Sequence, residues 1–424
     1  MMSLHSRVAI PCSIAMAAVL SLTLAGCGGS SEPSADSDGK VTITVLDSET
    51  DEPANSATDA LFAHCASNQP GVTIKRVTVP AAEYITKAVQ LTASGEAPDI
   101  LDTDGINVPT LAQAGVLAPI DDLVSSDKIN ADDYDEGPFS AGSYDGHQYA
   151  MPLGNNGEAL FYNKTMLEDA GIEPPKTWAD LQSAAQELTA GGVYGFAFSM
   201  QPGEEATWNW LPSLWSNGGD LDEVNSPEAV EAMEYWTGFV EDGVSPKAQL
   251  NLSSADIEPA FVQGKYAMAL LGTWTVPGLV KDAEAAGMEW GAVPQPSPDG
   301  SPSVTPFGGA VLAVGAKVVT DDAKQQAVFD CLAGLQDSAT MVEYADSAGY
   351  IPSYHPAATD FLADRPQYQA YADQFASSKS RTGVVGADYA KVSQAISTAI
   401  SEVATGQKSA QDALDTAQAA VPAS

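Results

Sequence analysis

The stretch VTITVLD (residues 41–47) has apolar residues at alternate positions, which is typical of a half-buried β-strand. A helical pattern follows over 57–71, and VTIKRVTV (72–79) returns to the pattern of a strand. A second helix is predicted over 83–94 and a short strand, PDIL, over 98–101. This β-α-β-α-β alternation predicts a parallel or mixed sheet wrapped by helices, hence an α/β fold.

The second half of the chain repeats this alternation. Thr177 and Asp180 are spaced as the N-cap and third residue of a helix in a capping box, and Ser226 is the expected N-cap of another helix. An apolar strand is predicted over 309–316, followed by a helix over 320–336. Because about 385 residues follow the first 39, the sequence predicts two domains.

The N-terminal region has the features of an export signal. A positive charge at Arg7 precedes an almost wholly apolar segment, and the quartet Leu24-Ala25-Gly26-Cys27 resembles the lipobox of bacterial lipoproteins. In that family the cysteine is lipidated and becomes the new N-terminus. The segment is long enough for a transmembrane helix, but no Lys or Arg cluster follows Cys27. We therefore expect a signal peptide over 1–26 and a lipidated Cys27 on a flexible tether over 27–39, with a plain signal peptide as the alternative.

Charge restricts the partners of this protein. The chain has 56 acidic and 18 basic residues, a formal net charge of −38, which becomes −39 when Arg7 leaves with the signal peptide. Such a surface repels phosphate backbones, so nucleic-acid binding is not expected. An anionic ligand would need a local basic pocket, and the sequence has no Lys/Arg cluster to form one. High acidity is also compatible with simple solubility.

Motifs of catalysis and metal binding are missing from the sequence. It has no GxSxG, HExxH, CxxC or GxxxxGK[ST], and its four histidines are far apart. We therefore expect no cofactor and no metal. After Cys12 and Cys27 are set aside, Cys65 and Cys331 remain.

Several stretches resemble the extracellular solute-binding proteins of ABC importers, the class that includes maltose-binding protein. The most specific is ALFYNKTMLEDAGIEPPKTWADLQSAAQEL (159–188), with its aromatic-Tyr-Asn-Lys strand and Pro-Pro-Lys-Thr-Trp helix entry. LPSLWSNGGDL (211–221), FVQGKYAMALLGTW (261–274), SAGYIPSY (347–354) and the opening VTITVLD occur in the same order as in that family. The resemblance covers nearly all of the chain after the tether.

The resemblance implies a two-lobed periplasmic-binding-protein-like fold. Each lobe would be a mixed β-sheet flanked by helices, and a hinge of several chain crossings would join them. Projected onto this sequence, lobe 1 comprises 40–153 and 308–356, and lobe 2 comprises 154–307 and 357–424. Cys65 and Cys331 then both fall in lobe 1, which implies a disulfide between them, two buried thiols being the alternative.

The implied function is that of a receptor rather than an enzyme. It would capture a carbohydrate, with an oligosaccharide expected, and deliver it to the permease subunits of an ABC importer. The protein would act as a monomer, exported and held on the outer face of the cell membrane by its lipid anchor.

A sugar presents hydroxyls around its rim and apolar faces, so its site needs flat aromatic surfaces and fixed hydrogen-bonding groups. Trp274 occupies the place where the family stacks a sugar on tryptophan. Asn156 lies where the maltose-binding branch has a sugar-binding carboxylate. An asparagine side chain still forms hydrogen bonds there but has no charge, and this difference puts maltose itself in doubt as the ligand. The further candidates by position are Trp208, Trp210, Asn155, Asp104, Asn107, Glu49, Tyr350 and Arg381.

Several of these candidates have a competing interpretation, which for Trp274 is a position in the core. Asp104 lies in a loop, where acids often form turns, and the tryptophan that the maltose-binding branch has nearby is missing. Arg381 can bind sugar hydroxyls, although pairing with acids is favoured. Other functions remain open at this point. A receptor for a polyamine would need several carboxylates that converge in the cleft. A glycoside hydrolase would need two carboxylates at a set distance from each other. A phosphate ligand would need a basic cluster, and an iron ligand would need a cluster of Tyr and His.

Overall fold

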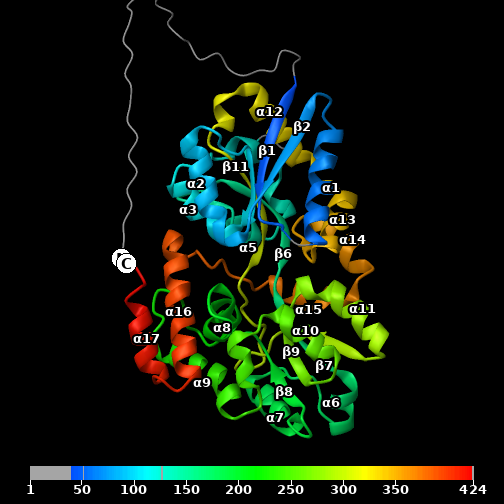
Figure 1. Cartoon of the computed structure of the whole chain (residues 1–424), viewed down its shortest axis with the longest axis vertical. Helices are drawn as coiled ribbons and strands as arrows, with labels where there is room; N and C mark the ends of the chain where they lie inside the picture. The colour runs from blue at the N-terminus through cyan, green and yellow to red at the C-terminus, as the bar shows by residue number, and fades with distance from the viewer. Residues whose placement is uncertain (1–39, 51, 126–127, 423–424) are drawn as a thin grey trace, which may run out of the picture.

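The structure is a computed structural model that describes residues 40–50, 52–125 and 128–422. Two lobes follow one another along the long axis of the molecule, each built on its own β-sheet (Figure 1). The predicted signal peptide, Cys27 and the tether lie outside the described residues. Within these residues, no helix combines the length and the apolar character needed to cross a bilayer.

Lobe 1 contains a six-stranded sheet in the order β12-β6-β11-β3-β1-β2. Its strands are β1 (Val41–Asp47), β2 (Val72–Thr78), β3 (Ile100–Asp104), β6 (Ala150–Asn156), β11 (Gly308–Val314) and β12 (Ile351–Pro352). The first strand pairs in parallel with β2 and β3, whereas β11 is antiparallel to both β3 and β6. The sheet is therefore mixed, as predicted.

Helices cover both faces of this sheet. In β1, Ile43 and Val45 pack toward α1 (Ala54–Ser67), α12 (Asp322–Gly334) and α13 (Ser338–Ala348). The next residue, Leu46, packs on the other face with α2 (Tyr84–Ser94) and α3 (Val108–Gln113). The strand is therefore buried on both sides rather than on one.

The periodicity of α2 predicts that Ile85, Val89 and Leu91 point inward, and this is wrong for Val89, which is exposed. The buried face carries Tyr84 and Ala88 instead. Because the Tyr84 hydroxyl donates a hydrogen bond to the carbonyl of Leu46 (3.3 Å), the first residue of the helix fixes its rotation against the sheet.

Lobe 2 contains a four-stranded sheet in the order β10-β7-β9-β8. Its strands are β7 (Glu158–Asn163), β8 (Tyr194–Ala197), β9 (Tyr266–Gly272) and β10 (Trp290–Val293). Met268 and Leu270 of β9 pack into one apolar cluster with α7 (Trp178–Leu188), α8 (Glu204–Ser216), α9 (Pro227–Glu241), α16 (Tyr389–Ala404) and α17 (Ala410–Gln418). The alternate residues, Ala269 and Leu271, face α10 (Ser254–Val262), α11 (Val276–Ala286) and α15 (Gln369–Phe375).

Local signals set several of these boundaries. The Thr177–Asp180 capping box and the Ser226 N-cap are both present, as predicted. The other short α-helices and strands are α4 (Asp121–Ser125), α5 (Glu136–Ser140), β4 (Ser143–Tyr144), β5 (His147–Gln148), α6 (Lys164–Ala170) and α14 (His355–Ala363).

The chain passes between the two sheets at three places. A single residue, Gly157, joins β6 to β7, residues 294–307 join β10 to β11, and α14 follows β12 on the way to α15. The segment after α15 then returns to the second crossing, where Lys379 hydrogen-bonds the backbone on both sides of Pro306. Several crossings lying together have the arrangement of a hinge. Lobe 1 of the structure is the part built on the six-stranded sheet, which includes Asn156 at the end of β6, and lobe 2 is the part built on the four-stranded sheet. The residue-level lobe boundaries expected from the sequence stay a prediction.

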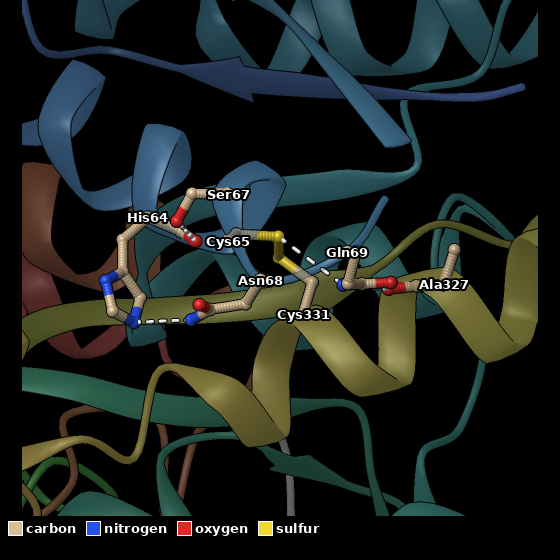
Figure 2. The surroundings of a disulfide bond; sticks show 7 residues. All are labelled: His64, Cys65, Ser67, Asn68, Gln69, Ala327 and Cys331. Carbon is tan, nitrogen blue, oxygen red and sulfur yellow. Dashed lines mark hydrogen bonds between the residues drawn. A yellow bond between two sulfur atoms is a disulfide. The ribbon is translucent and has the colours of Figure 1, made fainter. Parts of the chain in front are cut away.

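A disulfide joins Cys65 of α1 to Cys331 of α12 (Figure 2). Both sulfur-bearing residues are buried, and Gln69 donates from its amide to the carbonyl of Ala327 beside them (3.1 Å). The bond connects two helices on the same face of the lobe 1 sheet that lie 266 residues apart in the sequence. This is the pair that the resemblance implies.

Candidate ligand-binding cleft

A cleft of about 350 Å³ is lined by residues of both lobes. Lobe 1 contributes Asp104, at the end of β3, and Asn156, at the end of β6. Lobe 2 contributes the residues Glu204, Glu205 and Trp208 of α8, Ser253, Ser254 and Ala255 at the start of α10, Trp274 after β9, and Arg381 before α16. Five of the ten residues predicted from the sequence are therefore brought together here: Trp274, Asn156, Asp104, Trp208 and Arg381.

Trp274 supplies an aromatic surface to the cleft. Its side chain is 39% exposed, and it lies in a short 3-10 turn, Thr273–Thr275, directly after β9. A Cβ at Gly272 would collide with the indole ring, and a Cβ at Gly349 would collide with the backbone of Trp274. Because Gly272 and Gly349 have no side chains, the indole ring of Trp274 can lie against the end of its own strand, β9, beside the end of α13.

Arg381 is the cation of the cleft, and its side chain is only 2% exposed. Its Nη2 donates to both carboxylate oxygens of Asp104 at 2.8 Å, and Nη1 donates to Oε1 of Glu204 at 2.7 Å. Nε donates to the carbonyl of Phe307 in the second crossing (3.2 Å). The guanidinium group thus links lobe 1 to lobe 2. Burial alone lowers the pKa of Arg381, but the carboxylates of Asp104 and Glu204 raise it above its ordinary value.

Other side chains hold the partners of Arg381 in place. Glu204 accepts hydrogen bonds from the hydroxyls of Tyr389 (2.7 Å) and Ser393 (2.6 Å), both on α16. The guanidinium lies 4.5 Å from the ring centroid of Trp208, a cation–π distance. Trp208 is therefore mostly buried under Arg381, and it supports the arginine more than it offers an open face.

Sequence reasoning missed Glu204, Glu205, Ser253 and Ser254. Glu205 accepts from the backbone N–H of Ser254 (2.8 Å), which ties the first turn of α8 to the first turn of α10. Burial raises the pKa of Glu205. The adjacent pair Glu204-Glu205, one turn before Trp208, was the available signal, but only the packing of α16 and α10 shows that both carboxylates reach the cleft.

Two predicted residues lie in the interior instead. Trp210 is fully buried in the apolar cluster of lobe 2, so it does not reach the cleft. Residues two apart on a helix point to roughly opposite sides, so placing Trp208 at the cleft sends Trp210 into the core. Asn155 is likewise buried, and its Oδ1 accepts from the hydroxyl of Ser353. Its neighbour Asn156 faces the cleft because side chains alternate along a strand.

Three more predicted residues are not among those that line the cleft. The amide of Asn107 donates to the hydroxyl of Thr103 (2.9 Å), which is a local contact in lobe 1. Tyr350 stacks on Tyr344, with ring centroids 6.0 Å apart. Burial raises the pKa of Tyr350, and the negative charge of Glu49 raises it further. All three residues are partly buried.

The cleft therefore combines one exposed aromatic face, one amide and three carboxylates with a single internally paired cation. Among the described residues, no group of three His, Cys, Asp or Glu side chains is arranged to hold a metal ion. Aromatic faces together with fixed hydrogen-bonding groups suit a polyhydroxylated solute.

Two α/β lobes, joined by several crossings and enclosing such a cleft, define the class of hinged solute receptors. Within this class, the chain belongs to the bacterial extracellular solute-binding protein family, whose sequence profile matches residues 60–376. This is the family type that the sequence motifs suggest.

Individual relatives agree with this assignment. The maltodextrin-binding protein MdxE of Bacillus subtilis is 28% identical over 325 residues, 72% of each chain. A relative from Brucella abortus is 24% identical over 239 residues, so the match spans only 57% of that relative's length. Among solved structures, the cyclic α-maltosyl-1,6-maltose binding protein from Arthrobacter globiformis superposes with a TM-score of 0.76 at 28% identity, covering 90% of this chain and 98% of that one.

Proposed function

We propose that this protein captures a carbohydrate, with an oligosaccharide expected, and delivers it to the permease of an ABC importer without chemical change. The observation that carries the proposal is the exposed indole of Trp274 in a cleft that also presents Asn156 and three carboxylates. An indole ring stacks on the apolar face of a sugar, and amide and carboxylate groups bind sugar hydroxyls. The names of the Bacillus and Arthrobacter relatives, a maltodextrin-binding protein and a cyclic α-maltosyl-1,6-maltose binding protein, support the choice of ligand class.

Capture would proceed by closure of the lobes. A ligand that touches Trp274 in lobe 2 and Asn156 in lobe 1 binds better when the two lobes approach each other, so it shifts the population toward the closed state. The three crossings supply the hinge, because a few residues between packed elements can absorb the change in backbone angles. The permease would then recognise the closed receptor.

A polyamine is the second candidate, because the cleft is lined by Asp104, Glu204 and Glu205. Two of these carboxylates are already paired with Arg381, and Glu205 accepts from Ser254. The carboxylates are thus largely engaged within the protein, which favours the carbohydrate.

Thermal unfolding of the full chain against mono- and oligosaccharides and spermidine separates the two candidates. A ligand at 100 times its Kd adds about 2.7 kcal/mol of stability.

Trp274→Ala should weaken binding of the sugar identified in that panel by about 100-fold, because the stacking surface is lost at a site where one aromatic residue carries much of the binding energy. Isothermal titration calorimetry measures the change. The melting temperature of the free protein should hardly move, since the side chain is 39% exposed. Trp274→Phe is the matched control and should retain most of the affinity. Equal affinities of the Ala variant and the original protein would contradict the role of Trp274.

We also propose that lipidation of Cys27 anchors the protein on the outer face of the membrane, where it acts as a monomer. Cys27→Ser should abolish incorporation of a labelled fatty acid and move the protein from the membrane fraction to the soluble exported fraction. Cys12→Ser is the matched control, because Cys12 would be removed with the signal peptide. Continued labelling of the Cys27→Ser protein would refute the anchor.

A further inference from the structure

The charges that line the cleft do not balance. Asp104, Glu204 and Glu205 contribute three carboxylates, while Arg381 is the cationic side chain among the lining residues. With all four ionised, the lining has two negative charges in excess. This excess lies at the position that a captured ligand would occupy.

The one cation is not available to a ligand. All three guanidinium nitrogens donate to protein acceptors, and Nη2 alone contacts both oxygens of Asp104. The ring of Trp208 covers one face of the group, and the side chain is only 2% exposed. An anion that bound Arg381 would first have to break a two-oxygen contact with Asp104.

The carboxylates are held rather than mobile. Glu204 has two hydroxyl donors on α16 besides Arg381, and Asp104 also accepts from the backbone N–H of Ile106 (3.1 Å). A carboxylate fixed by several donors keeps its charge at the cleft and cannot easily turn away from an approaching anion. The carboxylates of Asp104 in lobe 1 and Glu204 in lobe 2 are equally accessible, each with 37% of its side chain exposed.

On the basis of the proposed function, we infer that Asp104 and Glu204 determine the charge specificity of the receptor. By occupying Arg381 they keep the cleft negative, so the site accepts uncharged glycosides and rejects sugar phosphates and sugar acids. This selection depends on the two residues that pair with Arg381 and not on the general acidity of the chain. Charges within a few ångströms of each other in a partly buried cleft interact strongly enough to change affinity by roughly 100-fold.

The test compares two probes of nearly equal size, maltotriose and its aldonic acid, maltotrionic acid, on the full-length protein by calorimetry. The original protein should bind maltotriose at least about 100-fold more tightly than the acid. In Asp104→Asn the guanidinium regains donors for an anion, and the ratio should fall by about tenfold or more. The double variant Asp104→Asn, Glu204→Gln should reduce it further. The single variant retains Glu204 as a partner for Arg381, and its melting curve verifies that it is folded.

A matched control removes two exposed acids that do not line the cleft, Glu241 of α9 and Glu284 of α11. The variant Glu241→Gln, Glu284→Gln should keep the original ratio. A fall equal to that of the cleft variant would assign the selection to overall charge and overturn the inference. Equal binding of both probes by the original protein would overturn it while leaving the receptor function intact. If the original protein bound neither probe and no sugar of the wider panel, the proposed function and this inference would fall together.

Discussion

Replacing Glu158 by glutamine should make the protein more stable, by about 4 kcal/mol near pH 8 and by little near pH 5. Glu158 begins β7 and is only 2% exposed. Neither of its carboxyl oxygens has a hydrogen-bond partner among the residues that the structure describes. A buried carboxyl group without a partner is far better tolerated in its neutral form.

The electrostatic surroundings reinforce this. The pKa of Glu158 is raised from its ordinary 4.5 to about 8, mainly by burial. The negative charge of Glu205 contributes to this increase, and the nearby amide of Asn209 offsets part of it. Between pH 4.5 and about pH 8, Glu158 of the folded protein keeps a proton that the unfolded chain releases. Stability therefore falls as the pH rises through this window, by up to about 1.4 kcal/mol per pH unit. Glutamine has the shape of the neutral acid and removes this dependence.

Urea unfolding at several pH values between 5 and 8 measures the effect as the difference between the variant and the original protein. Glu241→Gln, which changes an exposed glutamate, is the control and should give a small difference that does not vary with pH. If the curves for Glu158→Gln and the original protein ran parallel over this range, Glu158 would be ionised in the folded state and the interpretation would be wrong.

Loss of the Cys65–Cys331 disulfide should lower the free energy of unfolding by about 3 to 5 kcal/mol. The bond closes a loop of 266 residues, and in the chain-entropy model a crosslink over so long a loop removes much of the freedom of the unfolded chain. Unfolding in urea with and without reductant measures the loss. Ligand affinity should not change, because neither cysteine lines the cleft.

The variant Cys65→Ala, Cys331→Ala separates the crosslink from the packing of the sulfur atoms. It should be at least as unstable as the reduced protein, since both side chains lie in the lobe 1 core. Reductant should have no effect on this variant. Identical urea midpoints for the oxidised and reduced original protein would show that the bond contributes nothing to stability.

The sequence by itself determined the local elements and the class of fold. Alternation over 41–47, the capping box at Thr177 and the N-cap at Ser226 depend on residues within one or two turns of each other, so they can be predicted without a partner. The family-specific stretch 159–188 extended this to a two-lobed receptor. The charge predicted that nucleic acid is not a partner, and the missing motifs predicted no cofactor; both remain predictions.

Only the tertiary structure decided which candidates reach the cleft. Trp208 and Trp210 lie in the same helix, α8, and its packing brings Trp208 to the lining of the cleft beneath Arg381 and puts Trp210 in the lobe 2 core. The partner of Arg381, Asp104, lies 277 residues earlier in the chain. Such a pairing depends on how two separately folded lobes meet, because a salt bridge is set by distance in space and leaves no periodic signal in the sequence.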